Sequence, residues 1–194
     1  MEVVHKHRKK QIGVLQLQVV VNSGIEVVSN QVCYSLLDQR AAGEMTQLCL
    51  KHGVKLLAFG TLAGGFLSGK WLEKPEPVLN ESLTWSQMKY KRFIDAAGGW
   101  ERFQNLLATL QPIAQKHGVG IATLASHYML LQPAVAGVII GARLGKSEHL
   151  AENEGLFSIQ LDEADRSSIQ TALSSLQKIP GDCGDEYRKA PFLT

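Results

Sequence analysis

Apolar positions along the chain follow two spacings that alternate with each other. Short continuous apolar runs favour buried strands, and they occupy residues 27–33, 54–59 and 136–140. Apolar residues three or four apart favour helices, and this spacing predicts helices over residues 41–52, 87–96, 100–117, 121–132, 147–154 and 162–178. Residues 14–21 fit either a helix or a strand. Strands that alternate with helices predict an α/β fold, a parallel sheet with helices packed outside it.

Residues that commonly start or end helices agree with these boundaries. Gly53 and Gly118 follow two predicted helices, in the position where glycine often ends a helix. Asp162 stands where its carboxylate can accept a hydrogen bond from the first turn of the last helix. Residues 71–99 have a less regular spacing and read as an insertion with one short helix. We expect residues 179–194 to lie extended over the fold rather than to build it.

The composition is that of one soluble globular domain. The chain has 194 residues, of which 45% are hydrophobic and 20% charged, and this length suffices for a sizeable core. A formal net charge of +2 gives no reason to expect a nucleic-acid partner. The basic run HKHRKK at residues 5–10 is short and terminal, so we favour a solvated end over a partner contact.

No segment has the features of a membrane span, which needs roughly 20 apolar residues, or of a signal peptide. Cys33, Cys49 and Cys183 lack paired spacing, which suits a reducing compartment. We therefore expect a cytoplasmic location; the alternative is an organelle whose import sequence has been removed. The six histidines are scattered, so we expect no metal site.

The stretch GGFLSGKW at residues 64–71 contains most of the P-loop pattern of nucleoside-triphosphate sites. That pattern requires a Ser or Thr hydroxyl after the lysine to hold magnesium. Position 71 is Trp, and Gly64 comes four residues after Gly60 instead of directly after the strand. A P-loop is therefore not expected. The Rossmann pattern G-x-G-x-x-G is absent as well.

Two glycine turns suggest a different phosphate site. One turn begins at Gly60 after the second predicted strand, and the other, Gly141-Ala142-Arg143, follows the third. Backbone amides in glycine turns suit anions, and loops that follow parallel strands meet at one end of the sheet. The two turns favour a diphosphate site, although glycine in such turns is about as often purely geometric.

Longer stretches resemble the last three barrel strands of the aldo-keto reductase family. They are VVSNQVCYSLLDQR (27–40), GVKLLAFGTLAGGFLSGKW (53–71) and GVIIGARLGKSEHLAENEG (137–155), with KHGVGIATLASHYML (116–130) before the last strand. The resemblance is closest to the branch similar to aryl-alcohol dehydrogenases and potassium-channel β-subunits. It implies the C-terminal half of a (β/α)8 TIM barrel, with about three to four parallel strands and outer helices. It also implies NADPH-dependent reduction of an aldehyde or ketone, a small-molecule carbonyl substrate, to an alcohol.

On this interpretation the chain has three parts. Residues 1–14 are an atypical N-terminus without expected order, residues 15–178 are a partial NADP-dependent oxidoreductase domain, and residues 179–194 are a tail.

The resemblance also implies cofactor contacts, residue by residue. Gln31 matches a glutamine that hydrogen-bonds the nicotinamide carboxamide, and Phe59 an aromatic residue that stacks on the nicotinamide ring. Arg143, in the turn that begins at Gly141, matches a basic residue beside the adenosine 2′-phosphate, which favours NADPH. The other implied contacts are the pyrophosphate turn (Gly60, Thr61, Leu62, Gly65 and Lys70), a second basic position (His149), and the adenine-binding pair (Glu152 and Asn153).

The family's catalytic tyrosine, lysine, aspartate and histidine come from the first half of its barrel, which has no counterpart in this sequence. Tyr34 follows a predicted strand, but no lysine lies near it in the sequence, so we name no catalytic residue. We expect the chain by itself to be inactive. The alternatives are a non-catalytic nucleotide-binding or regulatory fragment and a truncated product without function.

Three or four strands cannot close a barrel of this kind, which takes about 250 residues. The strand near Val27 would then expose an edge and an apolar face. We expect the isolated chain to be marginally stable, or to associate with itself or with a partner subunit through this edge.

Overall fold

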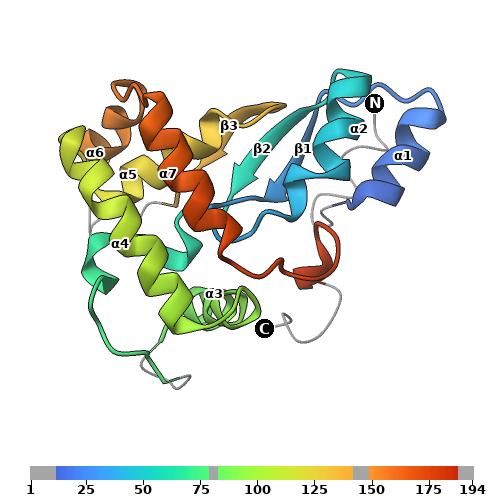
Figure 1. Ribbon diagram of the computed structural model, residues 1–194. Helices are drawn as coiled ribbons and strands as arrows, with labels where there is room; N and C mark the ends of the chain where they lie inside the picture. Colours follow the sequence, from blue (N-terminus) through green and yellow to red (C-terminus); the bar gives the residue numbers. More distant parts are fainter. Residues whose placement is uncertain (1–11, 79–82, 142–148, 188–194) are drawn as a thin grey trace.

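The computed structural model describes residues 12–78, 83–141 and 149–187 (Figure 1). Its centre is a parallel sheet of strands in the order β1 (Ser29–Cys33), β2 (Lys55–Phe59) and β3 (Val135–Ile139). Gln31 pairs with Leu57, which in turn pairs with Gly137. The predicted parallel sheet is therefore confirmed. β1 begins two residues after the start of the predicted run 27–33. Val28 lies before the strand and is 73% exposed.

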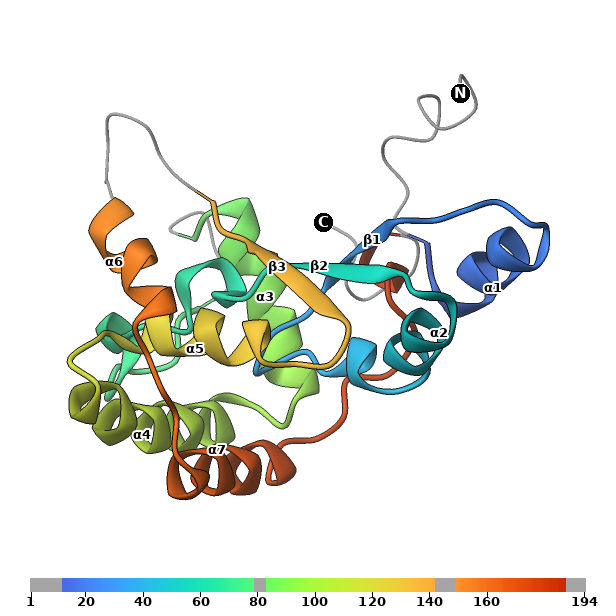
Figure 2. The same ribbon diagram turned by 90° about the horizontal axis from the view of Figure 1, so that it is seen from above.

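Helices pack on one side of this sheet. Figure 2 shows α2, α4, α5 and α7 on that side, with α1 beside α2 at the outer end of the molecule. Helix α3 lies beyond the carboxyl ends of the strands (Figure 1). The helices are α1 (Val14–Asn22), α2 (Glu44–His52), α3 (Trp85–Ala96), α4 (Trp100–Lys116), α5 (Ile121–Leu130), α6 (Leu150–Glu154) and α7 (Glu163–Ser174). Among the described residues, no helix is long and apolar enough to cross a membrane.

The last helix begins as the sequence predicts and ends earlier. The Asp162 carboxylate accepts a hydrogen bond from the Asp165 amide at 2.8 Å, and the Asp165 carboxylate accepts one from the Asp162 amide at 3.2 Å. This reciprocal pair is a capping box, so the predicted N-cap is confirmed. The helix stops at Ser174 instead of residue 178. The chain then turns away, and the Gln177 amide donates to the Ala97 carbonyl.

The core lies between the sheet and the helices. Val32, Leu56 and Ala58 point toward the helices and are completely buried. The opposite face of the sheet differs, because Gln31 is exposed and Leu57 is half-buried. Toward the carboxyl ends of the strands this second face is covered, since Cys33 is buried.

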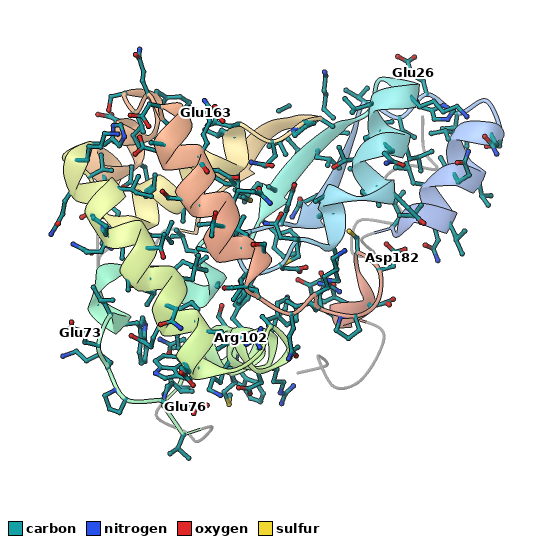
Figure 3. The ribbon with its side chains drawn as sticks, in the orientation of Figure 1. Glu26, Glu73, Glu76, Arg102, Glu163 and Asp182 are labelled. Carbon is teal, nitrogen blue, oxygen red and sulfur yellow. The ribbon has the colours of Figure 1, made fainter. Side chains whose placement is uncertain are left out.

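The described part of the predicted tail, residues 179–187, packs against the fold. It forms a short 3-10 helix, Asp185–Tyr187, and buries Cys183 and Glu186. Glu186 accepts a hydrogen bond from Arg40 at 3.0 Å, so an ion pair that the sequence spacing did not reveal attaches the tail to the 3-10 helix Arg40–Ala42, between β1 and α2. Asp182, labelled in Figure 3, accepts a hydrogen bond from the Val14 amide at the start of α1.

The predictions for the basic run at residues 5–10 and for Arg143 fall outside the described residues. The same holds for most of the predicted N-terminal segment and for residues 188–194 of the tail.

Candidate functional site

The glycine turn after β2 packs against α3 at Gly60 and Gly64. Gly60 adopts a left-handed conformation with φ of 73°, which only glycine takes without strain. A Cβ atom at this position would collide with the Tyr90 hydroxyl of α3. Gly64 and Gly65 also have positive φ angles, within and at the end of a 3-10 helix, Ala63–Gly65. The sequence therefore places glycine here because the backbone bends sharply under a neighbouring helix.

A cavity of about 260 Å³ opens beside this turn. Four elements that are distant in the sequence surround it: the turn, α5, the end of β3 and α6. Seven of the twelve predicted cofactor residues line it: Leu62, Gly65, Lys70, Gly141, His149, Glu152 and Asn153. The structure thus brings the first predicted glycine turn and Gly141, the described residue of the second, to one place at the carboxyl ends of neighbouring strands.

The side chains of the cavity combine apolar surface with a few polar groups. Lys70 is exposed, and its ammonium lies 5.7 Å from the centre of the Trp71 ring. His149 and Glu152 share a hydrogen bond of 2.8 Å on α6. The Thr123 hydroxyl of α5 donates to the Glu152 carbonyl at 3.3 Å, which holds α5 against α6. A cation beside apolar walls and a few polar groups suits a negatively charged small-molecule ligand.

The sequence did not identify the contribution of α5. Ala122, Thr123 and Ser126 line the cavity, although the apolar spacing of this helix pointed only to packing. Ser126 also shares a hydrogen bond of 3.0 Å with Thr61, whose side chain is buried. Thr61 therefore joins the turn to α5 through its hydroxyl and does not line the cavity.

The predicted nicotinamide contacts lie apart from the cavity, on the second face of the sheet. Gln31 and Phe59 belong to adjacent strands, and Gln31 pairs in register with Leu57, two residues before Phe59. Because side chains alternate along a strand, Gln31 and Phe59 point to the same face. Gly60 to Leu62 connect this face with the cavity.

An ammonium and a phenol meet beside Phe59. Lys89 of α3 is buried, and its ammonium donates to the Tyr187 hydroxyl at 3.0 Å and lies 5.5 Å from the centre of the Phe59 ring. Tyr187 is 52% exposed. Sequence spacing could not reveal this pair, because 98 positions separate the two residues and Tyr187 lies in the tail.

The other three tyrosines are enclosed. Tyr34, Tyr90 and Tyr128 are at most 8% exposed, and burial raises the pKa of each phenol above its ordinary value. A phenol of this kind gives up its proton less readily than one in water. Among the described residues, no group of three or more His, Cys, Asp or Glu side chains is placed to hold a metal ion.

Comparison with known families identifies the class of protein. The model of the aldo/keto reductase family matches residues 10–174, which is most of the chain. The chain therefore belongs to the aldo/keto reductase family, whose members use nicotinamide cofactors.

Curated relatives are longer than this chain. Flagellar radial spoke protein 5 of Chlamydomonas reinhardtii is 35% identical over 59% of the chain and 22% of its own length. Protein tas of Escherichia coli is 32% identical over 60% of the chain and 32% of its own length. Probable aldo-keto reductase 1 of Glycine max is 26% identical over 76% of the chain and 40% of its own length. The matched region thus spans less than half of each relative.

Solved structures share the fold at low sequence identity. A glycerol dehydrogenase, AKR11B4 of Gluconobacter oxydans, superimposes with a TM-score of 0.62 and 18% identity, covering 87% of this chain and 55% of its own. The aldo-keto reductase AKR11C1 of Bacillus halodurans gives a TM-score of 0.58 and 22% identity, covering 83% and 47%. The predicted partial α/β barrel is confirmed.

Proposed function

We propose that this chain forms the cofactor-binding part of an NADPH-dependent aldo-keto reductase. The observation that carries the proposal is the cavity beside the glycine turn that follows β2, where residues of this turn meet residues of α5, the segment after β3 and α6. Lys70 and the turn amides supply positive charge for a pyrophosphate. His149, Glu152 and Asn153 supply the polar groups for an adenosine end.

The second face of the sheet supports the other end of the cofactor. Phe59 offers the face of its ring, and the exposed Gln31 offers an amide that can both donate and accept hydrogen bonds. Bound NADPH supplies a hydride for an aldehyde or ketone. The side chains and turn amides named above would bind and orient the cofactor. The turn from Gly60 to Leu62 lies between the cavity and the second face of the sheet.

We further propose that the chain binds the nucleotide without reducing a carbonyl by itself. Three of its tyrosines are buried with raised pKa values, and the family's acid belongs to a segment with no counterpart in this sequence. The second candidate is a nucleotide-binding regulatory or interaction protein. It would bind the nucleotide in the same cavity without taking part in carbonyl reduction. The three buried cysteines agree with the proposed cytoplasmic location.

The first experiment is a titration with NADPH and NADH, followed by quenching of tryptophan fluorescence. Trp71 is a suitable reporter because the Lys70 ammonium lies beside its ring. We expect saturable quenching by NADPH, weakened about tenfold or more in Lys70→Met, since this change removes a direct charge contact. Lys51→Met on the exposed side of α2 is the control and should bind like the wild type. A signal that does not saturate would refute the proposal.

Two further measurements separate its parts. Arg143→Ala should weaken NADPH more than NADH, because the resemblance assigns Arg143 to the 2′-phosphate. Equal losses for both would contradict that assignment. Turnover of an aromatic aldehyde should be absent. Turnover lost in Tyr187→Phe would instead identify the Lys89–Tyr187 pair as an acid that the chain supplies itself.

A further inference from the structure

Lys89 is a buried cation that has no carboxylate partner among the described residues. It belongs to α3 and is 9% exposed. Its ammonium donates a hydrogen bond to the Tyr187 hydroxyl at 3.0 Å. The carboxylate of Glu186, next to Tyr187 in the chain, is paired with Arg40 instead. A buried charge is costly unless an opposite charge compensates it, so the surroundings of Lys89 favour an anionic partner.

Aromatic rings surround this ammonium. The ring centres of Tyr187, Tyr90, Phe59 and Phe93 lie 4.3, 5.2, 5.5 and 5.9 Å from Lys89 Nζ. The face of an aromatic ring attracts a cation, but it carries no net charge. The rings therefore shield the ammonium from water and leave its positive charge without a counter-charge.

The hydrogens that remain on Lys89 and Tyr187 are those that a carboxylate accepts. An ammonium has three N–H groups, and one of them donates to Tyr187. Since the Tyr187 oxygen accepts this bond, its own O–H group can donate to a further acceptor. Two N–H groups and one O–H group thus lie together beside a single positive charge. A carboxylate balances that charge, whereas a phosphate group carries up to two negative charges.

The tail holds Tyr187 in this position. Glu186 precedes it, and its carboxylate accepts a hydrogen bond from the buried Arg40 at 3.0 Å. The short 3-10 helix that ends at Tyr187 then brings the phenol to Lys89. Tyr187 is 52% exposed, so a ligand can reach the pair from solvent.

We propose that Lys89 and Tyr187 bind the carboxylate of a carbonyl substrate, so that the preferred aldehydes or ketones also carry a carboxylate. This inference rests on the proposed cofactor site, in which the Phe59 ring supports the nicotinamide. Lys89 Nζ lies 5.5 Å from the centre of that ring, and the Tyr187 ring centre lies 6.5 Å from it. A carboxylate oxygen about 2.8 Å from the ammonium therefore lies close to the place proposed for the nicotinamide, where the carbonyl of the same molecule must react.

The test compares two ligands that share a ring and a ketone: 4-acetylbenzoate and the neutral 4-acetylbenzamide. The full chain is titrated with each ligand by isothermal calorimetry, in the presence and in the absence of excess NADP+. The oxidised nucleotide cannot reduce the ketone, so only binding is measured. We expect 4-acetylbenzoate to bind at least tenfold more tightly than the amide, because hydrogen bonds between charged groups are roughly twice as strong as neutral ones.

Variants of the pair assign this preference to its residues. Lys89→Met keeps an apolar side chain without the charge and should remove the preference, while Lys89→Arg should retain most of it. Tyr187→Phe should weaken the binding of 4-acetylbenzoate about threefold or more and that of the amide less. Lys178→Met, at an exposed position before the tail, is the control and should bind both ligands like the wild type. Far-UV circular dichroism shows whether each variant folds.

Two results would overturn the proposal. In the first, the wild type binds both ligands equally or binds neither. The charge of Lys89 is then balanced within the protein, and the unpartnered Oε1 atom of Glu186 is the candidate acceptor. In the second, the preference persists in Lys89→Met, which places the carboxylate elsewhere. A failure of the proposed cofactor site has a different signature: NADPH does not bind, and a preference that depends on Lys89 remains without nucleotide.

Discussion

Asp165 connects the start of α7 with the end of α4, and its charge should stabilise the fold measurably. Its carboxylate is 5% exposed and accepts hydrogen bonds from Lys116 at 2.8 Å and from His117 at 2.8 Å. It also accepts the Asp162 amide of the capping box. Burial alone raises the pKa of this carboxyl, but the hydrogen bonds from Lys116 and His117 outweigh it and lower the pKa from 3.8 to about 2.

This pKa sets the size of the effect. A tenfold change in acidity corresponds to about 1.4 kcal/mol, so the fall in the pKa of Asp165 corresponds to roughly 2.5 kcal/mol. Lys116 is 48% exposed, and solvent screens part of its attraction. We therefore expect about 2 kcal/mol of unfolding free energy at neutral pH from the ionised form of Asp165.

The sign follows from the direction of the pKa change. A carboxyl whose pKa is lower in the folded state stabilises that state fully above its unfolded pKa, near 4, and the stabilisation is lost as the pH falls through the folded pKa, near 2. Asp165→Asn should lower the unfolding free energy by about 2 kcal/mol at pH 7. The difference between wild type and variant should shrink between pH 5 and pH 2, as measured by urea unfolding at each pH.

Glu163→Gln is the matched control. Glu163 lies in the same first turn of α7 and is exposed (Figure 3), so its loss should cost at most about 0.5 kcal/mol. A difference for Asp165→Asn that stays constant from pH 7 to pH 2 would refute the reasoning. Such a result would mean that the Asp165 side chain acts through packing and not through its charge.

Two other substitutions test the region around the proposed site. Arg40→Met should lower the unfolding free energy by about 3–5 kcal/mol, because it leaves the buried carboxylates of Asp38 and Glu186 without the guanidinium that binds them. The control is Arg166→Met, at an exposed position, which should have little effect in the same urea assay. Gly60→Ala should destabilise the turn by more than about 1 kcal/mol through its positive φ and the collision with Tyr90. Tyr90→Phe in the same chain should recover part of that loss, and no recovery would exclude the collision as a cause.

The proposed cofactor site has two parts, the cavity and the second face of the sheet. The cavity is lined by the turn after β2, by α5, by the two residues that follow β3 and by the start of α6. Gln31 and Phe59, by contrast, lie on the other face of the sheet, where Gln31 is exposed and α3 and the tail are the described elements beside Phe59. We therefore expect the adenosine part of NADPH to contribute most of the affinity in the isolated chain. A fragment such as 2′,5′-ADP should bind about as tightly as NADPH, as a competition titration can measure.

The sequence predicted most of the architecture because helix and strand periodicities are local. The runs at 54–59 and 136–140 became β2 and β3, and the spacing over 100–117 became α4. The N-cap at Asp162 was predictable for the same reason, since its partner is three residues away. Errors arose where burial depends on distant elements: the apolar Val28 is exposed because no described element covers it.

Only the tertiary structure decided which groups meet at the site. The contact of Lys89 with Tyr187, the ion pair of Arg40 with Glu186 and the hydrogen bond of Thr61 with Ser126 each join positions at least 65 residues apart. No local spacing encodes such contacts, because they depend on how α3, α5 and the tail pack against the ends of the strands. The sequence alone determined the order of strands and helices and the glycine turns between them. Their packing decided which side chains form the cavity and which side chains of the sheet are buried.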